Sequence, residues 1–533
     1  MVASPLFAVS CTQPGEVLED AHPSFLGLIQ DSRIAGCVAV QTQIPSVRTT
    51  YPVSDLNENH PRAIVNQQAS ILSPTAVPSR VADFLILTYT SLIIHSCPIL
   101  CEDEAKGAFD AVLASVFNPA CDARNMYIVS LIMAISLSTA ARNKLARAQS
   151  LATALFKNAM LHLSTVLTND LQGLQALLLL IHYTFLNPTV GNLWLLTGIS
   201  SEACIELGLH QEVQPGSGLS PLDLDKRRRI FWCAWEMEIG VSAALRRPIR
   251  TLSKHISVSF PRPTPILLPI ATLIWRYRQL EAELVSILHG DEPIPARFSS
   301  LEAWMADMET KVVEWTHELQ QSVAANECSS PAQPQWREMA LYGDIAYPYC
   351  LLLLYGPSNR VKTPTTPDLL RAFRASIQVA VNYWEQSNSE FGRIKYTFHT
   401  CYHTFAAALV FLRHYTYDKV QECAQCFARI LSSIGERWPA AARCLDEYNL
   451  LLEPIMKSYS DTLLQQQGFP DPFLTEGCFG EPFDVVDYEN FIHIFNPPHG
   501  VADNPLFSSP TSIPSDWDTE FQFGINLGSM DGL

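Results

Sequence analysis

The sequence predicts an all-α protein: a large multi-helix domain between a disordered N-terminal segment and an acidic, aromatic C-terminal tail. From about residue 80 to residue 460, apolar residues recur at three- and four-residue spacings, which places them on one face of a helix. Few stretches show the strict alternation of a half-buried strand. Of the 533 residues, 48% are hydrophobic and only 17% are charged, so the chain can bury a sizeable core.

Residues 1–79 differ in composition from the helical region. They are rich in Pro, Ser, Thr and Gln and show no sustained helical or strand period, so they are predicted to be mostly linker. The helical domain is expected over residues 80–457, and the tail over residues 458–533.

One helix of the domain has a clear start. Ser220 is a good N-cap, Pro221 suits the first helical position, and Asp223 completes a capping box. The residues that then lie along one face are Ile230, Ala234, Met237, Val241 and Ala244. Pro248 is expected to end this helix, because the residue before a proline is pushed out of helical geometry.

A second helix is predicted from about Leu193. Gly208 is placed for a left-handed C-terminal cap. The apolar residues that step along one face are Leu196, Ile199, Ala203 and Leu207. Both predicted helices are therefore amphipathic and need a partner to pack against.

Two long stretches lack charged residues, residues 84–101 and residues 171–201. A membrane span needs about 20 predominantly apolar residues. The first stretch contains several hydroxyl side chains and a proline, and Asn187-Pro188 breaks the second. Buried helices are the better interpretation, and no membrane association is expected.

The tail has an unusual composition. Residues 458–533 contain no Lys or Arg but 12 Asp and Glu, against a net charge of −17 for the whole chain. Bulky aromatics recur there, most clearly Trp517, Phe521 and Phe523 among acidic neighbours. This composition is typical of an acidic activation segment, whose like charges keep aromatic side chains available to a partner. The alternative is an acidic tail that only aids solubility.

Five segments together resemble a known family. They are residues 174–179 (LQALLL), 191–199 (GNLWLLTGI), 205–210 (IELGLH), 225–234 (DKRRRIFWCA) and 242–248 (SAALRRP). In this order they resemble the fungal-specific transcription factor domain, the middle regulatory region of zinc cluster activators such as the xylanolytic regulators. Weaker similarity at residues 84–100 and 353–358 extends the resemblance over roughly residues 80–455.

The resemblance implies a large helical domain, a nuclear location and a role in gene regulation. Members of this family generally bind DNA through a separate zinc cluster, often as dimers. The helical region is thought to restrain activity or to respond to an effector. Transcription machinery, a zinc cluster partner, a homo- or heterodimer and a small-molecule effector are therefore the expected contacts.

The sequence departs from the family where DNA would be read. The zinc cluster needs six closely spaced Cys with interleaved Lys and Arg, but residues 1–80 hold only Cys11 and Cys37, four Arg and no Lys. An acidic chain also lacks the electrostatic footprint of a DNA-binding protein. We expect no direct DNA binding from this chain, with DNA binding supplied by a partner or by a missing exon. A smaller departure is Arg246, where the family usually has Gly before an Arg-Pro step.

Few residues are candidates for a specific site. The run Lys226, Arg227, Arg228 and Arg229 is a possible nuclear import signal or phosphate contact. The more common role of such a run on a helix is a solvated face with salt-bridging arginines. No catalytic, cofactor-binding or DNA-binding residue is identified.

Metal binding is not expected. His399 and His403 lie at i and i+4 but lack the Glu of a metalloprotease motif, and the Cys423–Cys426 pair has no second pair at a suitable spacing. Packing roles are the more common explanation for both pairs.

The sequence therefore predicts a regulator and not an enzyme. The alternative is an all-α enzyme or small-molecule binder that shares only the fold. A deep polar pocket with convergent titratable residues would favour that alternative, whereas a pocket of leucines and aromatics would suit an effector.

Overall fold

The computed structural model describes residues 71–466, apart from short gaps at residues 115–121, 141–144, 215, 252, 263–268, 330–333, 389–396, 414–416 and 437. Most of the predicted N-terminal segment and of the predicted tail lies outside the described residues. Trp517, Phe521 and Phe523 lie outside them too, so their activating role stays a prediction.

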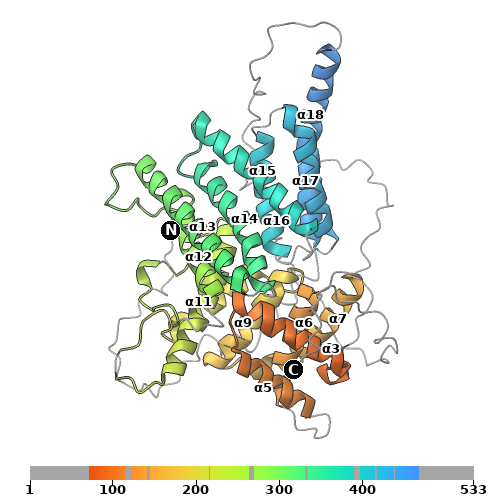
Figure 1. The fold of residues 1–533 in the computed structure, drawn as a ribbon, viewed down its shortest axis with the longest axis vertical. Helices are drawn as coiled ribbons and strands as arrows, with labels where there is room; N and C mark the ends of the chain where they lie inside the picture. The colour runs from red at the N-terminus through yellow and green to blue at the C-terminus, as the bar shows by residue number, and fades with distance from the viewer. Residues whose placement is uncertain are drawn as a thin grey trace, which may run out of the picture.

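Every regular element in these ranges is helical, which confirms the predicted fold class. The elements of the N-terminal part occupy the lower half of Figure 1 and are η3 (Pro74–Ala76), α3 (Ser79–Thr88), η4 (Tyr89–Ile93), α4 (Ile94–Ser96), α5 (Glu102–Ala114), α6 (Ala123–Ala140), α7 (Leu145–Met160), α8 (Leu163–Val166), α9 (Leu171–Leu186) and α10 (Leu193–Glu206). The remaining elements are α11 (Pro221–Ala244), η5 (Ser253–His255), α12 (Pro269–Leu288), α13 (Leu301–Ser329), α14 (Pro334–Tyr355), α15 (Thr366–Asn388), α16 (Thr397–Arg413), α17 (Tyr417–Gly435) and α18 (Pro439–Gln466).

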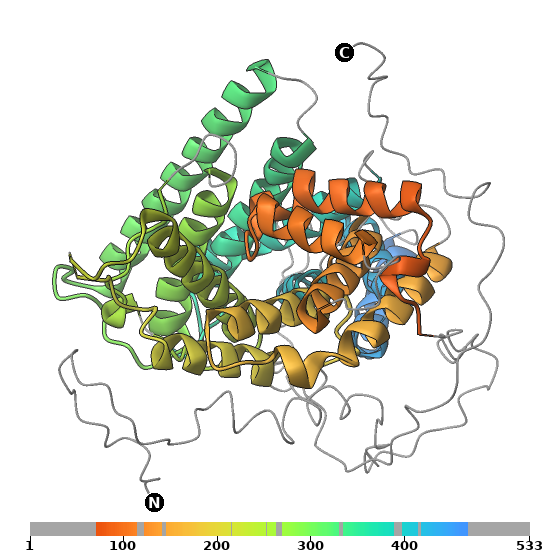
Figure 2. The same ribbon diagram turned by 90° about the horizontal axis from the view of Figure 1, so that it is seen from below.

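Consecutive helices mostly pack against each other, as in α6 with α7, α14 with α15 and α17 with α18. Buried apolar side chains from Leu72 to Ile455 form one continuous cluster. Figure 2 shows the helices of the N-terminal part beside those of the C-terminal part in a second view. The last helix, α18, continues to Gln466, across the boundary predicted for the tail, and Gly468 and Pro470 come after it in the sequence.

Helix α9 lies at the centre of the core. All fourteen residues from Gly173 to Leu186 are buried, and the helix packs against α6, α10, α11 and α16. The uncharged stretch from residue 171 is thus an internal helix, as its composition predicts. Among the described helices, none combines the length and the apolar character that crossing a membrane requires.

The two helices predicted in detail are present. Asn192 caps α10, and Gly208 adopts a φ of 62° just after it. The Ser220 side chain accepts a hydrogen bond from the Asp223 backbone N–H at the start of α11. The prediction of an amphipathic α11 is wrong for its second half, because nearly every residue from Ile230 to Ala244 is buried, on all sides of the helix.

The end of α11 also differs from the prediction. The helix ends at Ala244, before Pro248 can act, and Arg246 adopts a φ of 47°. Its neighbour Arg247 donates its backbone N–H to the Ser242 carbonyl, as in a Schellman cap. A left-handed residue after a helix is ordinarily Gly, so the backbone at this position favours the Gly that the sequence resemblance leads one to expect.

We expect the Arg246→Gly variant to be about 1 kcal/mol more stable than the Arg246→Ala variant, because only glycine adopts a positive φ without strain. Both variants lack the guanidinium group, so the comparison isolates the backbone. Chemical denaturation of the two variants measures the difference. Equal stability would show that the conformation at residue 246 is unstrained.

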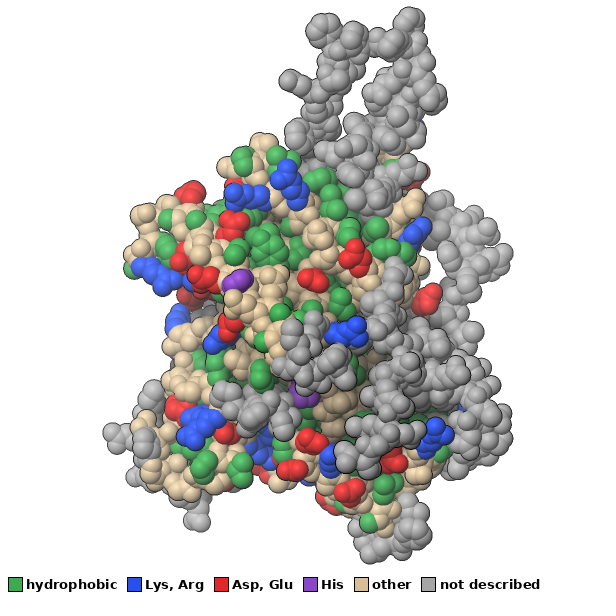
Figure 3. Space-filling model, in the orientation of Figure 1, with side chains coloured by type: hydrophobic (Ala, Val, Ile, Leu, Met, Phe, Trp, Pro, Cys, Tyr) green, Lys and Arg blue, Asp and Glu red, His purple; other side chains and the backbone are tan. Residues whose placement is uncertain are grey.

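The surface carries both signs of charge. On the face shown in Figure 3, the described Lys and Arg side chains are interspersed with Asp and Glu and are not gathered in a patch. Such a mixed surface differs from the basic patch through which a DNA-binding protein contacts the phosphate backbone.

Candidate functional site

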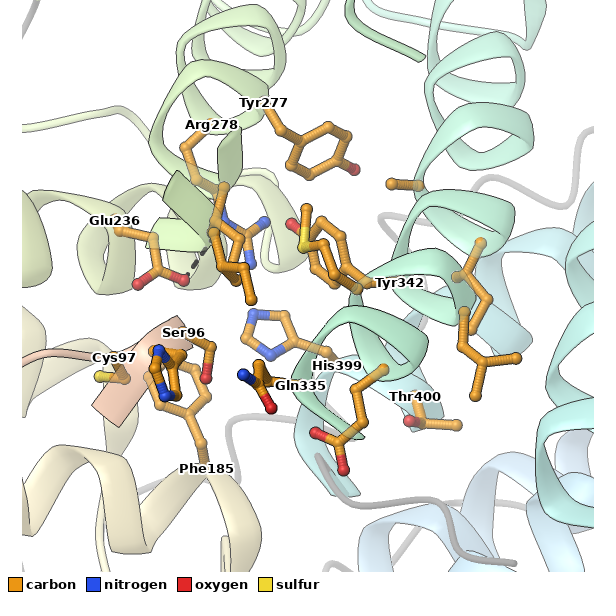
Figure 4. A pocket seen from close by; sticks show the side chains of 18 of the residues that line it. Ser96, Cys97, Phe185, Glu236, Tyr277, Arg278, Gln335, Tyr342, His399 and Thr400 are labelled. Carbon is orange, nitrogen blue, oxygen red and sulfur yellow. Dashed lines mark ion pairs between the residues drawn. The ribbon is translucent and has the colours of Figure 1, made fainter. Parts of the chain in front are cut away.

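A cavity of about 160 Å³ lies between helices in the middle of the fold. Its walls come mainly from α4, α9, α11, α12, α14 and α16, and Tyr383 of α15 also lines it. Figure 4 shows the side chains of Glu236, Arg278, Tyr342 and His399 around the same space. A cavity of this volume holds about one aromatic ring.

The charged side chains of the wall are Glu236, Glu338 and Arg278, and Arg278 also pairs with Glu281, which is not itself a lining residue. Arg278 Nη1 lies 2.5 Å from Glu281 Oε2, and both side chains are almost completely buried. Arg278 Nε lies 3.8 Å from Glu236 Oε1, on the neighbouring helix α11. One cation therefore faces two acids, so one carboxylate lacks a full counter-charge unless it is protonated.

The protonation of Glu236 follows from this arrangement. Burial raises the pKa of Glu236 to about 7, Arg278 opposes the rise, and the nearby Glu281 adds to it. Burial also raises the pKa of Glu281 despite its contact with Arg278. Near neutral pH the cluster thus takes up or releases a proton at Glu236, which is unusual for a carboxyl group.

Gly240 allows α12 and α16 to approach α11 closely at this point. A Cβ atom added at Gly240 would lie 2.7 Å from His399 Nε2 and 3.1 Å from Arg278 Nη2. The missing side chain therefore makes room for the imidazole and the guanidinium beside the helix.

The two histidines predicted to share a helix face do so on α16. The His399 ring stacks on Phe185, and the His403 ring stacks on Tyr349 with its Nδ1 2.9 Å from the Tyr383 hydroxyl. Burial lowers the pKa of His403 to about 3 and that of His399 well below its ordinary value, so both rings are neutral. In the described part of the chain, no group of three Cys, His, Asp or Glu side chains comes together in a way that could hold a metal ion.

The lining combines the titratable polar groups expected of an enzyme with the apolar and aromatic groups expected of an effector site. Apolar and aromatic side chains such as Ile274, Met339 and Phe185 alternate with the charged cluster. The Tyr342 hydroxyl is buried and has no hydrogen-bond partner among the described residues. Since an unpaired buried hydroxyl costs about 1–3 kcal/mol, the cavity suits a small molecule that carries both a ring and polar groups.

Comparison with known proteins connects this fold to gene regulation. Residues 125–265, from the start of α6 to the segment after α11, match the fungal specific transcription factor domain. The chain contains a fungal specific transcription factor domain. The matched segment includes residues 174–248, which carry the sequence resemblance, so the predicted resemblance is confirmed for this segment, and the matching domain is one of transcription factors.

Three relatives show how far the similarity extends. Pyrimidine pathway regulatory protein 1 of Saccharomyces cerevisiae is 21% identical, over 69% of this chain and 44% of its own length. Positive regulator of purine utilization of Emericella nidulans is 20% identical, over 58% of this chain and 37% of its own. Protein STB5 of Saccharomyces cerevisiae is 24% identical, over 61% and 47%. The chain thus spans less than half the length of these relatives and is distantly homologous to them.

Within the fungal specific transcription factor domain, contacts between two arginines and a tryptophan connect α10 to the segment after α11. The guanidinium of Arg250 lies 3.6 Å from the centre of the Trp194 ring, and that of Arg247 lies 4.8 Å from it. A Cβ atom at Gly198 would lie 2.9 Å from the Arg250 guanidinium. The motif at residues 191–199 therefore contacts the segment that follows α11, through Arg247 of the 242–248 motif and Arg250 just beyond it.

The basic run of the domain is held by internal contacts. Lys226 and Arg229 both pair with Glu104, at 2.6 and 3.3 Å. Arg228 pairs with Glu212 at 2.7 Å, and Arg227 donates to the carbonyl of Leu207 at 3.0 Å. The four side chains thus tie α11 to α5 and to the segment after α10. A role of Lys226, Arg227, Arg228 and Arg229 in nuclear import or phosphate contact stays a prediction.

Glu104 is the centre of the contacts around α5. Burial alone would raise its pKa, but the hydrogen bonds from Lys226 and the Cys101 backbone and the charge of Arg229 outweigh burial and lower the pKa to about 2. The folded state therefore gains stability from ionised Glu104 above its ordinary pKa of 4.5 and loses it as the pH falls toward 2.

Glu104→Gln is expected to cost about 2 kcal/mol of folding free energy at pH 7 and much less near pH 2, because about half of the folded-state carboxylate is protonated there. Denaturant unfolding across this pH range measures the effect. Glu102→Gln is the control, since Glu102 makes only an exposed pair with Lys106 on the same helix and should change stability by under about 0.5 kcal/mol. A loss that is the same at both pH values would contradict the role of the charge.

Sequence reasoning missed the charged cluster. Glu236 stands in the apolar run of α11, which is a usable signal because acids are rarely fully buried. Arg278 and Glu281, in contrast, have the three-residue spacing of an ordinary surface pair. Only the packing of α12 between α11 and α14 shows that they are internal.

Proposed function

We propose that the chain is a nuclear transcriptional regulator of the fungal zinc cluster type, acting through its helical domain and its acidic tail. DNA binding comes from a zinc cluster partner or from a missing exon. The tail recruits transcription machinery through Trp517, Phe521 and Phe523. The helical domain forms homo- or heterodimers or responds to a small-molecule effector.

The observation that carries this proposal is the match of residues 125–265 to a transcription factor domain. The geometry adds a reason for control by an effector. Helices α9 and α11 belong to the matched segment, whereas α12, α14 and α16 come from the following part, and the cavity lies where the two meet. A molecule in that cavity would favour one packing of these helices over another and so shift a regulatory equilibrium.

The catalytic form of the alternative function is not supported, because the similarity is to a family of regulators. The other half of the alternative, a small-molecule binder, agrees with the cavity and is retained as the effector role. The relatives named for a pyrimidine pathway and for purine utilization suggest that such effectors are small ring compounds.

A reporter assay tests the regulatory role. The full chain, fused to an unrelated DNA-binding domain, is expected to activate a reporter that carries the matching sites. Replacing Trp517, Phe521 and Phe523 by alanine should reduce this activation several-fold, because the aromatic groups contact the recruited partner. Replacing Ser508, Ser509 and Ser512 by alanine is the matched control, since both variants keep every acidic residue of the tail. A fusion no more active than the DNA-binding domain alone would remove the activating role.

The isolated chain is expected to bind duplex DNA no better than an unrelated acidic protein, because its net charge is −17. Fluorescence anisotropy with a labelled duplex at two salt concentrations measures this. Tight binding that weakens steeply with salt would contradict the prediction.

A further inference from the structure

The charge balance of the central cavity restricts what it can hold. Among the described residues that line it, Arg278 is the only permanent cation, and Glu281 already pairs with it at 2.5 Å. Glu236 and Glu338 add two carboxyl groups to the same lining. An anionic ligand would meet these acids with no uncommitted positive charge from the described lining to receive it, so this lining disfavours carboxylates and phosphates.

A cation, in contrast, completes the cluster. With Glu236 ionised, the contacting groups Glu236, Arg278 and Glu281 carry one net negative charge, and Glu338 in the same lining does not offset it. A ligand with one positive charge beside Glu236 brings that sum to zero, which is the condition under which buried charges are tolerated. A proton bound at Glu236 achieves the same balance.

The shape and the remaining groups indicate a ring. The volume of about 160 Å³ accommodates a single aromatic ring with a small substituent. Phe185 and His399 form a stacked pair at its edge, and the buried Tyr342 hydroxyl can serve as a hydrogen-bond partner. Figure 4 shows Phe185, His399 and Tyr342 among the side chains that line the cavity, together with Glu236 and Gln335.

We propose that this cavity binds a compact, ring-bearing organic cation, whose charged N–H groups contact Glu236 while its ring packs against the aromatic and apolar wall. The proposal rests on the effector role of the cavity under the proposed function and gives that effector a chemical class. Glu236 is the residue that determines specificity, and Arg278 with Glu281 positions its carboxylate.

Binding of such a cation is linked to the protonation of Glu236. A cation competes with the proton that Glu236 carries below a pKa of about 7, so affinity rises with pH. Arg278 and Glu281 on α12 are the charged groups that act on Glu236. The other titratable groups of the cavity wall are His95 and Cys97 on and beside α4, His182 on α9, Tyr277 on α12, Glu338 and Tyr342 on α14, Tyr383 on α15, and His399 and His403 on α16. Burial lowers the pKa of His182, His399 and His403 and keeps them neutral, whereas nearby acids raise the pKa of Arg278 and keep it charged.

Three probes of nearly the same shape test the charge preference. Benzamidinium, benzamide and benzoate share one ring and carry charges of about +1, 0 and −1, and their binding to the full chain is measured by calorimetry at pH 6 and pH 8. Benzamidinium is expected to bind tightest at pH 8 and about tenfold more weakly at pH 6, because about one tenth of Glu236 is ionised there. Benzamide and benzoate should show no such rise with pH.

Glu236→Gln should abolish both the preference for benzamidinium and its dependence on pH. Glu302→Gln, at an exposed position of α13, is the matched control and should leave both unchanged. Binding of benzoate as tight as that of benzamidinium, or binding of none of the probes, would overturn the proposal. The pH series on the unaltered chain decides the matter even if the Glu236 variant does not fold.

The binding assay and the reporter assay test different claims, so a negative result in one does not imply a negative result in the other. The reporter reads transcription through the tail with no probe added. Loss of reporter activity with intact benzamidinium binding would therefore refute the proposed function alone. Intact activation without binding would refute only the assignment of the cavity.

Discussion

Replacing Arg278 by methionine is expected to destabilise the folded chain by about 3–5 kcal/mol at neutral pH, the cost of leaving a buried charge without its partner. Glu281 is almost completely buried and depends on Arg278 for its counter-charge, and Glu236 lies 3.8 Å from the same guanidinium. Removing the cation leaves two acids side by side in the core. Denaturant unfolding of the variant measures the loss.

The pH dependence of this variant has a defined sign. Burial raises the pKa of Glu281 above its ordinary value of 4.5 even with Arg278 present, and loss of the guanidinium raises it further. A carboxyl whose folded pKa is raised destabilises the fold increasingly as the pH rises above its unfolded value. The loss should therefore be larger at pH 8 than at pH 5.

A double variant separates charge from packing. Arg278→Met together with Glu281→Leu should recover most of the lost stability, because an apolar pair of similar volume often replaces a buried ion pair at little cost. Glu236 can then remain protonated. A double variant as unstable as the single one would show that shape, and not charge, is what Arg278 supplies.

Replacing Gly173 by alanine is expected to cost about 3 kcal/mol, at the upper end of the usual penalty for overpacking. An added Cβ atom would lie 1.9 Å from the Thr168 carbonyl oxygen and 2.5 Å from the Thr168 nitrogen. Both are backbone atoms, so the turn before α9 must move. The same turn holds Asp170, whose carboxylate accepts the Gly173 N–H and caps α9, and its displacement removes that cap as well.

Gly107 in α5 provides the matched control. An added Cβ atom there has no atom within 4 Å, and the residue lies inside a helix. Gly107→Ala should therefore stabilise the chain by about 0.5–1 kcal/mol. Thermal unfolding of both variants tests the pair. If Gly173→Ala also stabilised the chain, the close approach at Thr168 would be refuted.

Much of the fold was predictable because it depends on local interactions. The N-cap at Ser220, the left-handed cap at Gly208 and the internal helix at residues 171–186 follow from side chains close together in the sequence. The family resemblance was equally visible, since its motifs are contiguous.

The end of α11 and its complete burial were not predictable in the same way. Arg246 adopts a glycine-like conformation that its side chain does not favour. The polar residues of the second half of α11, such as Glu238, are buried among neighbouring helices, so an apparent solvent face is internal. Packing from distant segments overrides the local pattern there.

The sequence alone determined the helical class of this protein, the limits of several helices and its relation to a family of regulators, because helix periods, caps and motifs involve residues within a few positions of one another. Only the tertiary structure decided the cavity. Glu236, Arg278, Tyr342 and His399 come from four helices, and their proximity depends on how those helices pack around Gly240. The proton affinity of Glu236 is likewise a property of the packed core, since burial and two charges from α12 set it.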